Sequence, residues 1–137
     1  MRSLLIFKKL ETNPKQLFVI DGLGALLSAI LLGVVLVKFE EVFGIPKVSL
    51  YILAVFPLFF MVYDVFSYFQ TRDKVSLLLR AIAIINVMYC GLSLGFGVYH
   101  FNSITYFGWL YIFVEVFIII VLVLIELKVA NRVSKKV

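Results

Sequence analysis

The chain has 137 residues, of which 64% are hydrophobic and only 15% are charged, and its mean hydropathy is +1.12. About a quarter of the residues of a soluble domain are charged, so this composition excludes an ordinary soluble domain. The formal net charge is +5. We interpret this excess as a signal for membrane topology and an attraction to anionic lipid head groups, and we expect no nucleic-acid partner.

Residues 1–15 form a basic segment ahead of the first apolar stretch. Its apolar and basic side chains alternate along the sequence: Leu4, Leu5, Phe7 and Leu10 stand against Arg2, Lys8 and Lys9. Two interpretations remain open, a short helix lying in the cytoplasmic interface or a basic tail without fixed structure. A segment of this length is too short to form a soluble domain with its own core.

Four apolar stretches follow, at residues 16–37, 47–70, 74–98 and 105–127. Because a helix rises about 1.5 Å per residue, each stretch is long enough to cross a hydrocarbon core about 30 Å thick. The short connections between them favour antiparallel neighbours. The sequence therefore predicts an all-α fold, a single transmembrane domain over residues 1–137 built as an antiparallel, up-down-up-down four-transmembrane-helix bundle.

The first two spans each carry an aspartate at membrane depth. In the first span, Asp21 and Ser28 lie seven residues apart on one helix face that is otherwise lined by small residues. Such a face allows another helix to pack closely. In the second span, Asp64 lies on nearly the same face as Pro57, which we expect to kink the helix and free a carbonyl beside a cavity.

The third span places Arg80 six residues from its start. Asp21, Asp64 and Arg80 all lie about 8 to 9 Å inside the cytoplasmic ends of their helices, so they share a layer. A charge at this depth is expensive unless it is compensated. We expect the Arg80 guanidinium to bridge the two aspartates in a buried ion network that is either a cytoplasmic gate or only a determinant of helix register.

The fourth span holds Glu115 about 18 Å from its cytoplasmic end, level with Asn86 and Ser28. No lysine or arginine lies at that level in the sequence. The predicted neighbours of Glu115 are Asn86, Ser28, Tyr89 and Tyr111, and we expect its carboxyl to be protonated or solvated by water. These five residues form the predicted ligand-binding or ion-binding site, with Glu115 as its proton or cation site.

Glu126 follows Glu115 by eleven residues, which places the two acids about 20° apart on one helix face. We group Glu126 with the charge network of Asp21, Asp64 and Arg80, although interfacial snorkelling beside Lys128 is the simpler interpretation. Residues 128–137 then form a basic cytoplasmic tail.

Lysines and arginines predict the orientation. Four precede the first span, two lie in the second connection and four follow the last span. The first connection offsets its two lysines with two glutamates, and the third connection has no lysine or arginine. Under the positive-inside rule both termini are cytoplasmic. The predicted location is a bacterial cytoplasmic (inner) membrane.

The single cysteine and the single histidine exclude several chemistries. Cys90 alone precludes an intrachain dithiol relay, and His100 alone precludes bis-histidine haem and argues against a zinc or copper cage. We therefore assign no catalytic residue, no metal and no cofactor. We expect a protein that is not an enzyme, with a lipid-modifying enzyme using the cytoplasmic carboxylates as the remaining exception.

Two functions remain open. The first is a small transporter or ligand-binding bundle in which Glu115 binds a proton, a cation or a small polar substrate. The second is a structural or accessory subunit of a larger membrane complex. The expected partners are membrane lipids together with further copies of the chain or the other subunits of a complex.

Overall fold

The computed structural model describes residues 12–136, and the possible interfacial helix near the N-terminus lies outside them. This part of the chain is helical and has no strand. Four of its helices are long and apolar enough to cross a membrane, and they cover Gln16–Lys38, Lys47–Tyr68, Arg72–Tyr99 and Tyr106–Ser134. These findings confirm the predicted all-helical membrane protein as far as its helical class and its four apolar spans are concerned.

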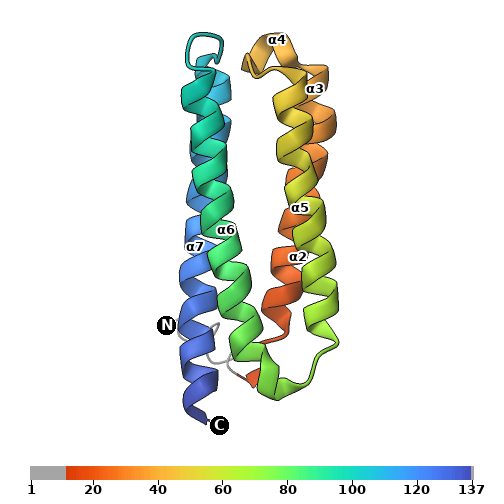
Figure 1. Ribbon diagram of the computed structural model, residues 1–137, viewed down its shortest axis with the longest axis vertical. Coiled ribbons are helices and arrows are strands. Elements are labelled where there is room, and N and C mark those ends of the chain that lie inside the picture. Colours follow the sequence, from red (N-terminus) through yellow and green to blue (C-terminus); the bar gives the residue numbers. More distant parts are fainter. Residues whose placement is uncertain (1–11, 137) are drawn as a thin grey trace.

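The elements follow one another in this order: α2 (Gln16–Ile30), the π-helix η1 (Leu31–Val35), α3 (Leu36–Lys38), α4 (Glu40–Phe43), α5 (Lys47–Tyr68), the 3₁₀ turn η2 (Arg72–Lys74), α6 (Val75–Tyr99) and α7 (Tyr106–Lys136). Figure 1 shows them as two long pairs, with α2 beside α5 and α6 beside α7. Contacts within each pair are extensive, whereas contacts between the pairs are sparser. The helix pairs therefore leave room between them for side chains and a cavity.

The first span contains a π-helical turn, η1, between α2 and α3. A π-turn inserts an extra residue into the helical ladder and is found frequently at functional sites. Gly33 lies in this turn, where an added Cβ would contact Ala54 Cβ of α5 at 3.4 Å. The sequence analysis did not predict this irregularity.

The second span runs as one α-helix from Lys47 to Tyr68, through Pro57. Proline in a helix removes one backbone hydrogen bond, and the neighbouring helices must bury or satisfy the freed carbonyl. Pro57 is buried, on the side of α5 that faces the other helices. The helix is therefore not interrupted there, and the proline faces the interior as expected.

The last helix is longer than the sequence analysis predicted. α7 continues to Lys136, so residues 128–136 are helical and not a separate tail. The reason is a continued apolar face, because Val129, Ala130 and Val133 are buried at helical spacing after Glu126. The Ser76 hydroxyl of α6 also donates to the Ala130 carbonyl oxygen at 2.9 Å. The extension places Glu126 well inside the helix and not at its end.

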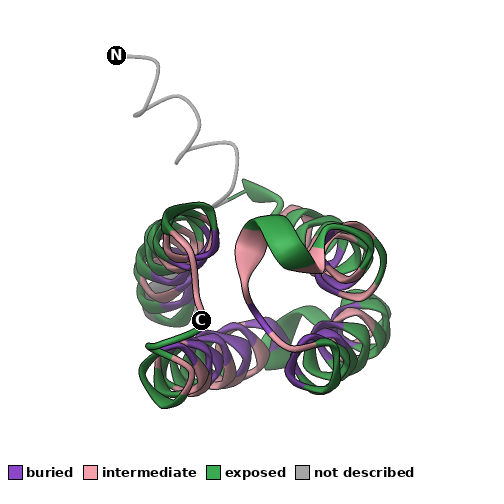
Figure 2. Cartoon of the chain, turned by 90° about the horizontal axis from the view of Figure 1, so that it is seen from above, coloured by how far each residue is buried: buried purple, intermediate pink, exposed green. Residues whose placement is uncertain are grey.

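Burial separates the inner from the outer faces of the helices. Viewed from above, buried residues line the inner faces of the helices and exposed residues lie outside (Figure 2). Large apolar side chains remain exposed on every span, among them Leu23, Phe59, Met88 and Phe117, which are 63–70% exposed. Monomeric soluble proteins rarely expose apolar surface on this scale. A lipid environment accounts for such a surface.

The two connections at one end of the molecule contact each other. Gly44 ends α4 with φ of 73°, in the left-handed region that favours glycine. The Thr105 backbone N–H donates to the Phe43 carbonyl oxygen at 3.2 Å, and its hydroxyl donates to the Val42 carbonyl oxygen. The hydroxyl oxygen also accepts from the Gly108 N–H at 3.3 Å, so Thr105 caps the start of α7.

Candidate functional site

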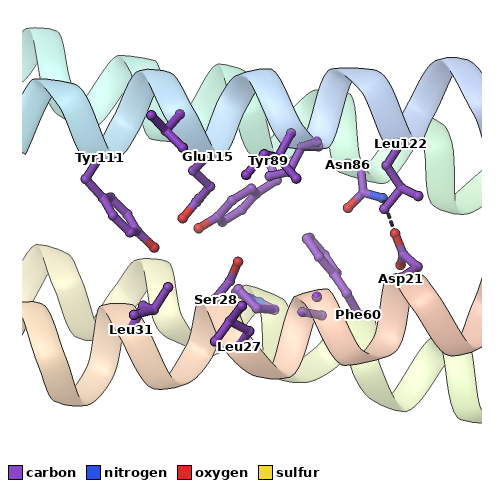
Figure 3. Close-up of a pocket in the computed structure, with 16 residues that line it drawn as sticks. Asp21, Leu27, Ser28, Leu31, Phe60, Asn86, Tyr89, Tyr111, Glu115 and Leu122 are labelled. Atoms are coloured by element: carbon purple, nitrogen blue, oxygen red, sulfur yellow. Dashed lines mark hydrogen bonds between the residues drawn. The ribbon is translucent and has the colours of Figure 1, made fainter.

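A cavity of about 280 Å³ lies between the helix pairs (Figure 3). All five residues of the predicted ligand site line it: Ser28, Asn86, Tyr89, Tyr111 and Glu115. The sequence prediction that these residues share one site is therefore consistent with their placement. Whether they bind a ligand stays a prediction.

The Glu115 carboxyl lies at one end of this cavity. Figure 3 shows the hydroxyls of Ser28, Tyr89 and Tyr111 pointing toward the same space as that carboxyl. Glu115 is 8% exposed, and the Tyr89 and Tyr111 hydroxyls are its polar neighbours, but none of these groups forms a hydrogen bond of normal geometry with the described residues. Buried polar groups normally pair. The carboxyl and the two tyrosines are therefore arranged to receive a polar or charged group.

The rest of the cavity wall is apolar and aromatic. The Phe60 and Tyr89 rings meet edge to face with their centroids 5.7 Å apart. At the outer edge lie Leu27 of α2 with Val114 and Ile118 of α7, and these three side chains are 48–59% exposed. The cavity therefore borders the lipid-facing surface between α2 and α7. A molecule with an apolar body can reach it from the side.

Asp21 and Asn86 lie at the other end of the cavity. The Asn86 side-chain N–H donates to Asp21 Oδ1 at 2.9 Å, and both residues are buried (Figure 3). This bond joins α2 to α6, and hence one helix pair to the other. It also links the two polar layers that the sequence analysis treated separately, because Asn86 belonged to one and Asp21 to the other.

Asp64 and Glu126 complete a buried cluster with Asp21. Asp64 is 1% exposed and Glu126 0% exposed. The charged neighbours of the Asp64 carboxyl are Asp21 and Glu126, and Asp21 is also the charged neighbour of Glu126. Gly22, next to Asp21, lies close to Asp64, since an added Cβ there would be in van der Waals contact with Asp64 Cβ at 3.4 Å. Three acids from three helices thus lie together.

Arg80 does not bridge these acids. Its side chain is exposed, and its guanidinium donates to Asn131 Oδ1 at 2.8 Å. The predicted fork between Arg80 and the two aspartates is therefore wrong, and Asn86 takes its place as the donor to Asp21. The physical reason is the length of α7, whose last turns supply an amide partner for Arg80 near the end of the bundle.

The sequence analysis missed two residues beside the acid cluster. Ser67 is fully buried on α5, three residues after Asp64, and its hydroxyl has no hydrogen-bond partner among the described residues. Tyr63 lies near Ser67, Asp64 and Glu126 and donates its hydroxyl to the Leu78 carbonyl oxygen at 3.0 Å. The i, i+3 spacing of Asp64 and Ser67 was the available signal.

Over residues 12–136, no group of three or more histidine, cysteine, aspartate or glutamate side chains has an arrangement suited to a metal ion. Comparison of the chain with protein-family models, with characterised proteins and with solved structures finds no match.

Proposed function

We propose that the chain is a small transporter or ligand-binding bundle whose cavity binds a cation at Glu115. The observation that carries this proposal is the buried Glu115 carboxyl, which lines a cavity with aromatic walls and forms no hydrogen bond of normal geometry with the described residues. A carboxylate attracts a cation strongly where water is excluded. The rings of Phe60, Tyr89 and Tyr111 line the same cavity, and aromatic rings add cation–π attraction where a cation lies over them. A lipophilic organic cation has both the positive charge that the carboxylate attracts and an apolar body that fits the aromatic walls.

The lateral edge of the cavity supports the same class of ligand. Leu27, Val114 and Ile118 place apolar surface where the cavity borders the lipid. An amphiphilic cation concentrates at the membrane and can enter sideways. The π-turn that begins at Leu31 and the buried Pro57 flank the cavity, and both are helix irregularities at which movement is easiest.

The distribution of lysines and arginines supports an up-down-up-down bundle with both termini in the cytoplasm, in a bacterial inner membrane. In that orientation the acid cluster lies toward the cytoplasm and Glu115 lies nearer the middle of the membrane. A cation bound at Glu115 is then within reach of either side after a modest rearrangement.

The test is binding of benzyltrimethylammonium to the full chain in lipid nanodiscs, measured by isothermal titration calorimetry. We expect one site per chain and an affinity at least about tenfold lower for Glu115→Gln, since each tenfold is about 1.4 kcal/mol. The matched control is Glu41→Gln, which removes an exposed acid of α4. Equal affinity in the Glu115 and Glu41 variants would contradict the proposal, provided that both retain the helical circular dichroism of the parent.

A second function, as a subunit of a larger assembly, is favoured by Gly91 and Gly95. These glycines lie four residues apart on α6, and an added Cβ at either would meet nothing within 4 Å. A small residue every fourth position on an apolar helix is a face on which a second helix can pack closely. The expected partner is another membrane helix, either of a second copy or of a different chain.

A further inference from the structure

We propose that the cluster of Asp21, Asp64 and Glu126 is a second site, distinct from Glu115, and that it binds a proton shared among its carboxyls. The three acids come from α2, α5 and α7, and one of them, Asp21, lines the cavity at the end away from Glu115. The cluster differs from the ligand site in gathering three carboxyls, of which Asp64 and Glu126 are at most 1% exposed.

The first support is the charge of the surrounding groups. Among the described residues, the groups beside the cluster include the Tyr63 phenol and the Ser67 hydroxyl of α5 and the Asn86 amide of α6. Arg80 points elsewhere, to Asn131. Several carboxylates that are buried side by side repel one another, and a proton held between them removes one charge. Each uncompensated buried charge is costly, so proton binding is favoured there.

The second support is independent of charge and concerns hydrogen bonding. Both oxygens of Asp64, both oxygens of Glu126 and the Ser67 hydroxyl are more than nine-tenths buried and form no hydrogen bond of normal geometry with the described residues. The Asn86 amide that faces Glu126 donates to Asp21. Carboxylate oxygens only accept hydrogen bonds, whereas a protonated carboxyl also donates one. A bound proton therefore supplies the donor that these buried oxygens lack.

The absence of a metal-binding arrangement among the described residues leaves the proton as the simplest cation for this site. A proton needs no coordination shell and can be shared by two oxygens, which suits three carboxyls on separate helices.

Asp21 provides a physical link between the two sites. It belongs to the acid cluster, it lines the cavity and it accepts the hydrogen bond from Asn86. A cation in the cavity and a proton on the cluster therefore repel each other through the same carboxylate. This coupling rests on the proposed function, whereas the proton site itself does not.

The experiment is infrared difference spectroscopy of the full chain in lipid bilayers, titrated from acid to alkaline pH. Protonated carboxyls have a C=O stretching band separate from that of carboxylates. We expect a band that disappears as pH rises in the parent protein and in Glu115→Gln and Glu41→Gln. In Asp64→Asn and Glu126→Gln we expect this band to be lost or to disappear at a more acid pH, because a repelling carboxylate has been removed.

Two results would overturn the proposal. A titrating band that is unchanged in both cluster variants would place the proton elsewhere, and a band removed by sodium ions at constant pH would identify an alkali cation site. The outcome is separable from that of the cation-binding test. If Glu115 binds no organic cation, the cluster band still titrates, and if the cluster holds no proton, benzyltrimethylammonium still distinguishes Glu115→Gln.

A second measurement covers the case in which the cluster variants do not fold. A groove of about 350 Å³ between α2 and α5, lined by Gly22, Met61 and Asp64, connects this acid to the lipid-facing surface. Dicyclohexylcarbodiimide is apolar and modifies protonated carboxyls, so we expect it to label Asp64 of the unmodified protein. Labelling mapped by mass spectrometry should fall at least tenfold from acid to alkaline pH. Labelling of a cluster acid to the same extent at every pH would contradict the proposal.

Discussion

At the scale of single residues, Asn86 is the most informative polar group of the bundle. It is buried, it lines the cavity and its amide donates to Asp21 across the gap between the helix pairs. The Asp21 Oδ2 atom has no partner among the described residues. The single bond to Asn86 is therefore the hydrogen bond that compensates the burial of this carboxyl.

Removing that amide should destabilise the bundle. We expect Asn86→Ala to lower the free energy of unfolding by about 1–3 kcal/mol, because a buried acceptor is left without a donor. Unfolding by sodium dodecyl sulfate in mixed micelles, followed by circular dichroism, measures this change. Gln70→Ala is the matched control, since its amide bonds the Phe66 carbonyl oxygen at 3.3 Å in an exposed turn. If the two substitutions lowered the free energy of unfolding equally, the Asn86 hydrogen bond would stabilise the bundle no more than an exposed one does.

At the scale of helices, the start of α7 is held against the first connection by close backbone contact. Gly108 lies one turn into α7, where an added Cβ would overlap the Phe43 carbonyl oxygen. Thr105 bonds both Val42 and Phe43 at the same place. The orientation of the α7 face that carries Glu115 depends on this contact, since Gly108 and Glu115 lie on the same side of the helix.

A methyl group at Gly108 should disturb this contact. We expect Gly108→Ala to lower the free energy of unfolding by about 1–3 kcal/mol, because a backbone carbonyl cannot move aside cheaply. Gly24→Ala is the control, and there the methyl group meets open space. The control should be neutral or raise the free energy of unfolding by up to about 1 kcal/mol, as alanine is the better helix former. Detergent unfolding of both variants, with opposite signs expected, provides the measurement.

At the scale of the whole molecule, two tightly packed helix pairs meet through side chains and enclose a cavity. The exposed face of α6 at Gly91 and Gly95 is the part of the surface best suited to a further helix. Since lipid provides no hydrophobic drive between helices, close packing at small residues is what makes association favourable.

Enlarging these glycines tests assembly. If the chain associates through α6, Gly91→Leu and Gly95→Leu should abolish the complex, which native mass spectrometry in mild detergent records as subunit masses. Val62→Leu is the control, because it enlarges a 62% exposed side chain on α5. Persistence of the same complex in both glycine variants would argue against this interface. The mass of the co-purifying chain would also separate a homo-oligomer from an accessory subunit.

Much of the candidate site was predictable from helical periodicity. Glu115 and Glu126 share a face at eleven residues, and both are buried. Depth counting placed Ser28 and the two tyrosines with Glu115, whereas Asn86 lies beside Asp21 at the other end of the same cavity. The same method failed for Arg80, because position along a helix predicts depth but not rotation toward a particular neighbour. It also placed Glu126 near a helix end, because the continued apolar face beyond residue 127 was not followed.

The sequence by itself determined the class of the protein and the limits of its four spans except the end of the last, because the length and hydropathy of a segment are local properties. The partners of the buried charges were decided only by the tertiary structure. Asp21 pairs with Asn86, Arg80 with Asn131, and Asp64 lies beside Glu126. These residue pairings depend on the rotation of each helix and on the separation of the two helix pairs. Packing across the whole bundle sets both quantities.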